Sequence, residues 1–123
     1  MRDIQKVLER WGSWAVSEDS GVDFSHIAAG FKGLLPVTGK SRITCTDDDG
    51  LIIEKCMTRL NQRKPYEYDL LVAHYILRIS KRKIAKKLKC DEKKIRIEMQ
   101  MAEGFIDGCL SMLEVKLDMD FEC

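Results

Sequence analysis

The segment that most constrains the fold is residues 80–102, which read SKRKIAKKLKCDEKKIRIEMQMA. Apolar residues recur there at helical spacing in two runs, which the short polar break at 89–91 separates. Ser80 and Asp91 stand at the starts of these runs and are typical N-cap residues, because their side-chain oxygens can accept from first-turn N–H groups. The pattern therefore predicts two short helices joined by a tight turn, a helix-turn-helix. The side chains expected to face inward are Ile84, Ala85, Leu88, Ile95, Met99 and Ala102.

The same region carries a strong concentration of positive charge. Between Arg78 and Arg96 there are ten basic and two acidic residues, which gives +8 in a chain of net charge +1. Duplex DNA carries roughly one negative charge per 1.7 Å of helix axis, so such a surface suits phosphate binding. Charge alone leaves open a merely solvated lysine-rich face. Its coincidence with the two-helix pattern favours DNA binding.

Helix-turn-helix geometry assigns roles to the individual side chains. The N-terminal part of the second helix enters the major groove in such motifs. The predicted groove residues are Lys93, Lys94, Arg96 and Ile97, together with Glu92, whose carboxylate could accept from a cytosine amine. The predicted phosphate contacts, which position the protein without reading sequence, are Lys81, Arg82, Lys83, Lys86, Lys87 and Lys89.

The remaining sequence predicts an all-α fold in a single domain covering residues 1–123. Asp3 is expected to cap a first helix that runs to about Val16. Trp11 and Trp14 share the apolar face of this helix, and they either pack in the core or are exposed for a partner. A long loop is expected at about 32–47. The helix after it should turn Leu51, Ile52, Cys56 and Leu60 to the core, with Ile53 and Met57 beside them.

The C-terminal part of the chain is acidic. Residues 97–123 hold seven acidic side chains and one basic one. An acidic tail is expected at about 114–123, and its end, DMDFEC (118–123), is expected to fray. The opening residues are amphipathic and charged, unlike a secretory signal. No apolar run approaches the roughly 20 residues that cross a bilayer, so a cytoplasmic protein without membrane contact is expected.

Nothing in the sequence predicts a metal, a cofactor or an enzyme. The five cysteines form no CxxC pair, and His26 and His74 lie far apart. The acidic run at 47–49 precedes a helical pattern, so these carboxylates are expected to cap that helix and complement its positive end. No nucleophile is paired with a base.

The helix-turn-helix resembles region 4 of sigma factors. That motif carries Ala, Leu, Val, Arg, a large apolar residue and Ala at the positions held here by Ala85, Leu88, Ile95, Arg96, Met99 and Ala102. Lys89 departs from the pattern. It occupies the turn position that is usually Gly, since that position favours a left-handed backbone.

Nearly the whole chain resembles the phage antitermination protein Q family, in the type with a sigma region 4-like fold. The matching stretches are MRDIQKVLERWGSWA, HIAAGFKGLLP, CTDDDGLII and the basic helix-turn-helix ending in MAEGFIDG. The resemblance implies a protein that binds a DNA element near the phage late promoter. It also implies loading onto bacterial RNA polymerase held with sigma at a promoter-proximal pause, and suppression of pausing and termination.

In this type, the resemblance further implies a collar that narrows the RNA exit channel, within the host bacterial cytoplasm. Lys32, Lys40 and Arg42 in the long loop are candidates for contact with nascent RNA or polymerase. Two other functions stay open from the residues themselves. One is a plain helix-turn-helix DNA-binding regulator, and the other is a helical protein-interaction module whose basic face docks an acidic protein.

Overall fold

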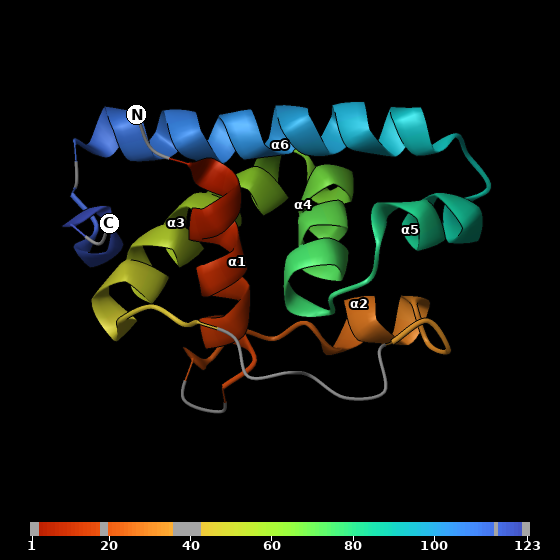
Figure 1. Cartoon of the computed structure of the whole chain (residues 1–123), viewed down its shortest axis with the longest axis horizontal. Coiled ribbons are helices and arrows are strands. Elements are labelled where there is room, and N and C mark those ends of the chain that lie inside the picture. Colours follow the sequence, from red (N-terminus) through yellow and green to blue (C-terminus); the bar gives the residue numbers. More distant parts are fainter. Residues whose placement is uncertain (1–2, 18–19, 36–42, 115, 122–123) are drawn as a thin grey trace.

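The longest helix, α6 (Glu92–Leu113), runs along one edge of the molecule, and the other helices pack beneath it (Figure 1). The computed structural model describes residues 3–17, 20–35, 43–114 and 116–121. Among these residues every regular element is a helix and there is no strand, which confirms the predicted all-α class. None of the described helices is both long and apolar enough to cross a membrane.

The helices that precede the basic segment form the body of the fold. Helix α1 (Ile4–Ala15) begins after Asp3, whose carboxylate accepts from the backbone N–H groups of the first turn, as predicted. Helix α2 (Ser25–Gly30) is a short turn of helix. Helix α3 (Asp47–Arg63) is followed directly by α4 (Pro65–Leu71), and Pro65 occupies the first position of α4, where its missing N–H costs little.

Helix α4 continues into a wider π-helical turn, η2 (Val72–Ile76), before the chain enters α5 (Lys81–Leu88). Helix α1 packs against η2, and Gly12 allows the two backbones to come close together. A methyl group added at Gly12 would overlap the carbonyl oxygen of Tyr75 and lie 2.6 Å from its carbonyl carbon. The position is thus restricted to glycine by close backbone packing rather than by its own backbone conformation.

The core joins the apolar stripes of α1, α3, α4, η2 and α6. Trp11 is fully buried and Trp14 nearly so, which places both indoles in the core rather than on an exposed docking face. Each indole N–H donates to a carboxylate of α3, Trp11 to Glu54 at 3.1 Å and Trp14 to Asp47 at 2.9 Å. These bonds satisfy polar groups that would otherwise be buried without partners.

The stripe of α3 differs from the expected one. Leu51 is half exposed, and the core contacts come from Ile53, Cys56, Met57 and Leu60. The reason lies at the start of the helix. Gly50 packs against the ring of Trp14, so the buried face begins at Asp49 and Gly50, and Leu51 turns outward.

The acidic run at 47–49 lies in the first turn of α3, where negative charge complements the helix dipole, as predicted. The prediction that these acids cap the helix is wrong, because the N-cap is Thr46, whose hydroxyl oxygen accepts from the N–H of Asp49 at 3.2 Å. Asp49 has a further role, since its buried carboxylate accepts from the N–H groups of Asp118 (2.7 Å) and Met119 (3.0 Å).

The expectation that the acidic end frays is wrong for residues 118–121. A short 3-10 turn, η3 (Asp118–Phe121), folds back beside the start of α3 (Figure 1). Leu117 and Met119 are buried, and the hydroxyl of Thr46 donates to Asp118 at 2.9 Å. The apolar residues interleaved among the acids, together with the carboxylate of Asp49, hold this segment on the body of the protein.

Candidate nucleic-acid interface

Helices α5 and α6 meet at a tight turn whose geometry the local sequence specifies. The hydroxyl of Ser80 accepts from the N–H of Lys83 at 3.2 Å, and the carboxylate of Asp91 accepts from the N–H of Lys93 at 3.1 Å. Both predicted N-caps are therefore confirmed. The Ser80 cap fixes the start of α5, the helix before the turn, and the Asp91 cap fixes the start of α6, the helix after it.

Lys89 closes α5 in the left-handed backbone conformation, with φ 56° and ψ 48°. The next N–H, that of Cys90, donates back to the carbonyl of Ala85 at 3.0 Å, as in a Schellman cap. This conformation costs a residue with a Cβ about 1–2 kcal/mol. Lys89 thus adopts the geometry that glycine usually supplies, and the packing of α5 on α6 must offset the strain.

The inward face of the two helices matches the predicted stripe except at one position. Ile84, Ala85, Ile95, Met99 and Ala102 are all buried. Leu88, in contrast, is 38% exposed, because it lies in the last turn of α5, next to the turn that leads into α6. The prediction that Leu88 faces the core is therefore wrong.

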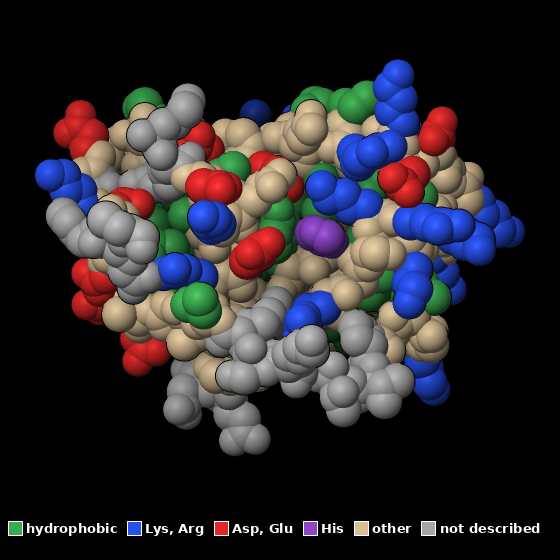
Figure 2. All heavy atoms as spheres, viewed as in Figure 1, with side chains coloured by type: hydrophobic (Ala, Val, Ile, Leu, Met, Phe, Trp, Pro, Cys, Tyr) green, Lys and Arg blue, Asp and Glu red, His purple; other side chains and the backbone are tan. Residues whose placement is uncertain are grey.

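The predicted DNA-contacting cations share one end of the molecule, which we call the basic surface. Figure 2 shows Lys and Arg side chains gathered over the end that carries α5. All of its members are exposed except Lys81, which is half-buried. The basic surface comprises Lys81, Arg82, Lys83, Lys86, Lys87, Lys89, Lys93, Lys94 and Arg96.

Two groove candidates on α6 are paired within the helix. The guanidinium of Arg96 lies 3.3 Å from the carboxylate of Glu92, and the ammonium of Lys94 lies 3.8 Å from that of Glu98. Exposed pairs of this spacing are worth about 0.3–0.5 kcal/mol. Phosphate or a base edge can therefore replace the Glu92 carboxylate at small cost, whereas the Glu98 side chain is only 21% exposed and its release from Lys94 costs more.

The start of α6 also presents an apolar side chain. Ile97 is 48% exposed and lines a shallow depression of about 390 Å³ together with Asp91, Lys93, Lys94 and Glu98. An exposed aliphatic group beside cations suits contact with a thymine methyl in a major groove. Of the predicted groove residues, Lys93, Lys94 and Ile97 share this depression, whereas Glu92 and Arg96 do not line it and pair with each other.

A second polar site was not apparent in the sequence. Lys6, Glu9 and Arg10 of α1 line a cleft of about 610 Å³ with His74, Tyr75 and Arg78. The two groups come from segments more than sixty residues apart, so no local pattern could join them. The cleft adjoins α5, since Arg78 lies two residues before its N-cap.

His74 holds the segment that leads into α5 by a hydrogen bond to its backbone. Its Nδ1 donates to the carbonyl of Ile79 at 2.9 Å, which fixes the Nδ1-protonated tautomer when the ring is neutral. Burial lowers the pKa of His74, and the hydrogen bond to Ile79 opposes that shift while the positive charge of Lys81 adds to it. Arg78, which lies between His74 and Ile79 in the chain, adopts a left-handed backbone with φ 62°.

The remaining candidates lie elsewhere. Lys32 is exposed just after α2, whereas Lys40 and Arg42 fall outside the described residues. In the described part of the chain, no group of three or more His, Cys, Asp or Glu side chains could hold a metal ion. The cysteines within that part, Cys45, Cys56, Cys90 and Cys109, form no disulfide with one another.

Comparison with known proteins gives the fold and the family. Two solved structures of the transcription antitermination factor Q21 superpose on 90% of this chain. One has a TM-score of 0.60 at 20% identity over 89% of its own length. The other, in complex with Q21-binding-element DNA, has a TM-score of 0.62 at 18% identity over 91% of its length. At such identities the likeness establishes a shared fold.

Sequence relatives are much closer. The probable antitermination protein Q of Acyrthosiphon pisum secondary endosymbiont phage 1 is 55% identical over 122 residues, which are 98% of this chain and 82% of that protein. The prophage antitermination protein Q homolog QuuD of Escherichia coli K12 is 47% identical over 120 residues, 98% of this chain and 94% of that protein. The family model described as phage antitermination protein Q matches residues 1–118. The chain therefore belongs to the phage antitermination protein Q family.

Proposed function

We propose that this protein is a phage transcription antitermination factor whose basic surface binds duplex DNA at an element near the late promoter. The observation that carries the proposal is the concentration of exposed cations on two helices joined by a capped turn. A protein of the same fold, Q21, is in complex with its binding-element DNA, which supports the assignment.

The proposed contacts divide by position on the two helices. The exposed side chains at the start of α6 would enter the major groove, and the α5 lysines would lie against the phosphates. Arg96 would exchange Glu92 for a base edge or phosphate, which leaves Glu92 available to a cytosine amine. The proposed groove set is Glu92, Lys93, Lys94, Arg96 and Ile97.

On this proposal the DNA-bound protein loads onto bacterial RNA polymerase paused with its sigma factor. It then travels with the enzyme in the host cytoplasm and suppresses pausing and termination by narrowing the RNA exit channel. Membership of the antitermination family supports this sequence of events. Lys32, together with Lys40 and Arg42, is proposed to contact polymerase or the nascent RNA.

The DNA interface can be tested with a matched pair of charge-removal variants. Lys94→Ala combined with Arg96→Ala should weaken binding to the late-promoter element by about 1–3 kcal/mol per lost base contact and reduce its preference over scrambled DNA. Lys55→Ala with Arg59→Ala removes the same charge from α3 and serves as the control. Equal losses from both pairs would mean that only net charge matters and would contradict the proposed interface.

Antitermination itself is tested by transcription through a terminator with purified RNA polymerase, from a template carrying the phage late-promoter region. Readthrough that disappears when the promoter-proximal DNA is scrambled is the expected result. DNA binding without readthrough would instead identify a plain DNA-binding regulator. Absence of both activities would leave a helical protein-interaction module.

A further inference from the structure

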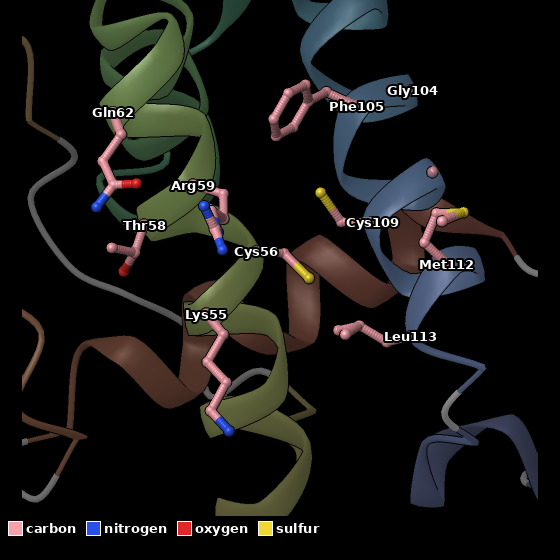
Figure 3. A pocket seen from close by; sticks show the side chains of 11 residues that line it. Lys55, Cys56, Thr58, Arg59, Gln62, Gly104, Phe105, Cys109, Met112 and Leu113 are labelled. Carbon is pink, nitrogen blue, oxygen red and sulfur yellow. The ribbon is translucent and has the colours of Figure 1, made fainter.

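A hollow of about 1040 Å³ lies between α3 and the C-terminal half of α6 (Figure 3). Phe105, Cys109 and Leu113 project from α6 toward α3, and Cys56 of α3 faces them. We call this hollow the α3–α6 groove. Its wall on α6 is mainly apolar, although it opens to solvent.

Apolar side chains are left uncovered along the α6 wall. Met112 is 85% exposed and Leu113 is 52% exposed, while Phe105 and Cys109 are only partly buried. Exposed apolar surface concentrated around a hollow differs from single scattered residues, which need no explanation. The groove therefore has the composition of a contact surface for another molecule.

Two glycines on the α6 wall of the groove support its interpretation as a contact surface. Gly104 and Gly108 lie inside α6, where glycine lowers helix stability relative to alanine. A Cβ at either position would meet no atom within 4 Å, so neither glycine is needed for packing within the described chain. A glycine pair one turn apart does, however, let the backbone of another helix come close.

The opposite rim of the groove is positively charged. Lys55 and Arg59 stand one turn apart on α3, and both are exposed. No ion pair to either side chain occurs within the described portion of the structure. A ligand that fills the groove should therefore carry acidic groups along the edge that meets α3.

We propose that the α3–α6 groove is the docking site for an amphipathic helix of a partner protein, with an apolar face against α6 and acidic side chains toward Lys55 and Arg59. A helix fits because the groove is apolar on its α6 wall and open where the two glycines lie. The charge on the rim selects an acidic helix over a neutral or basic one.

The groove and the basic surface can be occupied at the same time. Gly108 lies fourteen residues beyond Lys94 on α6, which at 1.5 Å per residue is about 21 Å along the helix. Docking in the groove does not depend on DNA binding. That the protein connects DNA to the partner rests on the proposed function, in which the basic surface binds DNA.

The test uses the full chain and a fluorescent 18-residue amphipathic peptide that has a leucine face flanked by glutamates. A second peptide with lysines in place of the glutamates is the matched control. Fluorescence anisotropy should show at least tenfold tighter binding of the acidic peptide, and NMR shift changes should fall on the amides of Gly104 and Gly108. Failure of the acidic peptide to bind, or equal binding of both peptides, would overturn the proposal.

Two variants locate the binding. Gly108→Leu adds a side chain where the groove is open, so it should weaken acidic-peptide binding at least tenfold while leaving DNA binding unchanged. Lys55→Glu with Arg59→Glu should reverse the preference between the two peptides. Unchanged binding in Gly108→Leu would refute the site. A concentration-dependent dimer that Gly108→Leu abolishes would overturn the partner helix in favour of a second copy of this chain.

Discussion

Gly12 and Gly104 both lie inside helices, yet their surroundings predict opposite responses to the same substitution. A Cβ at Gly12 would overlap the backbone carbonyl of Tyr75, whereas a Cβ at Gly104 would meet nothing within 4 Å. Replacing each glycine with alanine therefore makes one chemical change in two environments. The helix-propensity gain is the same at both sites, so the difference between the variants measures the contact of α1 with η2.

The magnitudes follow from the two terms involved. Alanine in place of glycine inside a helix adds about 0.5–1 kcal/mol of stability, and Gly104→Ala should show this gain in full. At Gly12 the same gain is opposed by overpacking, which typically costs 1–3 kcal/mol or more. The overlap is with a backbone carbonyl that cannot rotate away, so Gly12→Ala should be less stable than the parent by about 1–2 kcal/mol.

The assay is urea unfolding followed by far-UV circular dichroism, with thermal melting as a second readout. For a domain of this size a change of 1 kcal/mol shifts the melting temperature by about 3–6 °C, so the two variants should move in opposite directions from the parent. An unchanged urea slope would confirm that stability, not the extent of unfolding, has changed. Equal stabilisation by both substitutions would refute the close approach of α1 to η2.

Three further outcomes are expected. Ile95→Asp should disrupt the packing of α5 on α6, because Ile95 is fully buried and a carboxylate there would have no partner; unaltered melting would refute its placement. His74→Gln should reduce the loss of stability as pH falls below about 6.5, because the pKa of His74 is lower in the folded chain than in the unfolded one. Below that pH the unfolded state takes up more protons than the folded state, which favours unfolding. Urea unfolding at pH 7.5 and 5.5 measures the change in the free energy of unfolding, and His26→Gln, at an exposed histidine, is the control. Asp49→Ala should release the C-terminal turn, since two backbone N–H groups lose their acceptor at about 1–3 kcal/mol each, and hydrogen exchange that stays slow there would contradict this role.

The elements that local sequence specified were predicted well. Ser80 and Asp91 cap the helices they precede, and the buried set of Ile84, Ala85 and Ile95 follows from helical periodicity. Capping and periodicity act over three or four residues, so they can be read directly from the sequence. Leu88 was misplaced because periodicity gives the face of a helix but does not say whether another element covers its end.

The features that sequence did not reveal all depend on distant segments meeting. The polar cleft joins Lys6 and Arg10 to His74 and Arg78, and the groove joins α3 to the last turns of α6. The acidic tail was expected to fray, since its composition is that of a solvated end. Its position is set by Asp49, whose carboxylate lies about seventy residues earlier in the chain.

The sequence by itself determined that the chain is helical, where the capped turn lies and that most of its positive charge is concentrated around that turn. The tertiary structure decided which of these side chains stay exposed, how the tail is held and where a hollow remains on the surface. Helix starts and stripes depend on interactions within one or two turns, which the order of residues specifies. Clefts, grooves and docked ends depend on which helix faces meet, and that is settled only when the whole apolar core packs together.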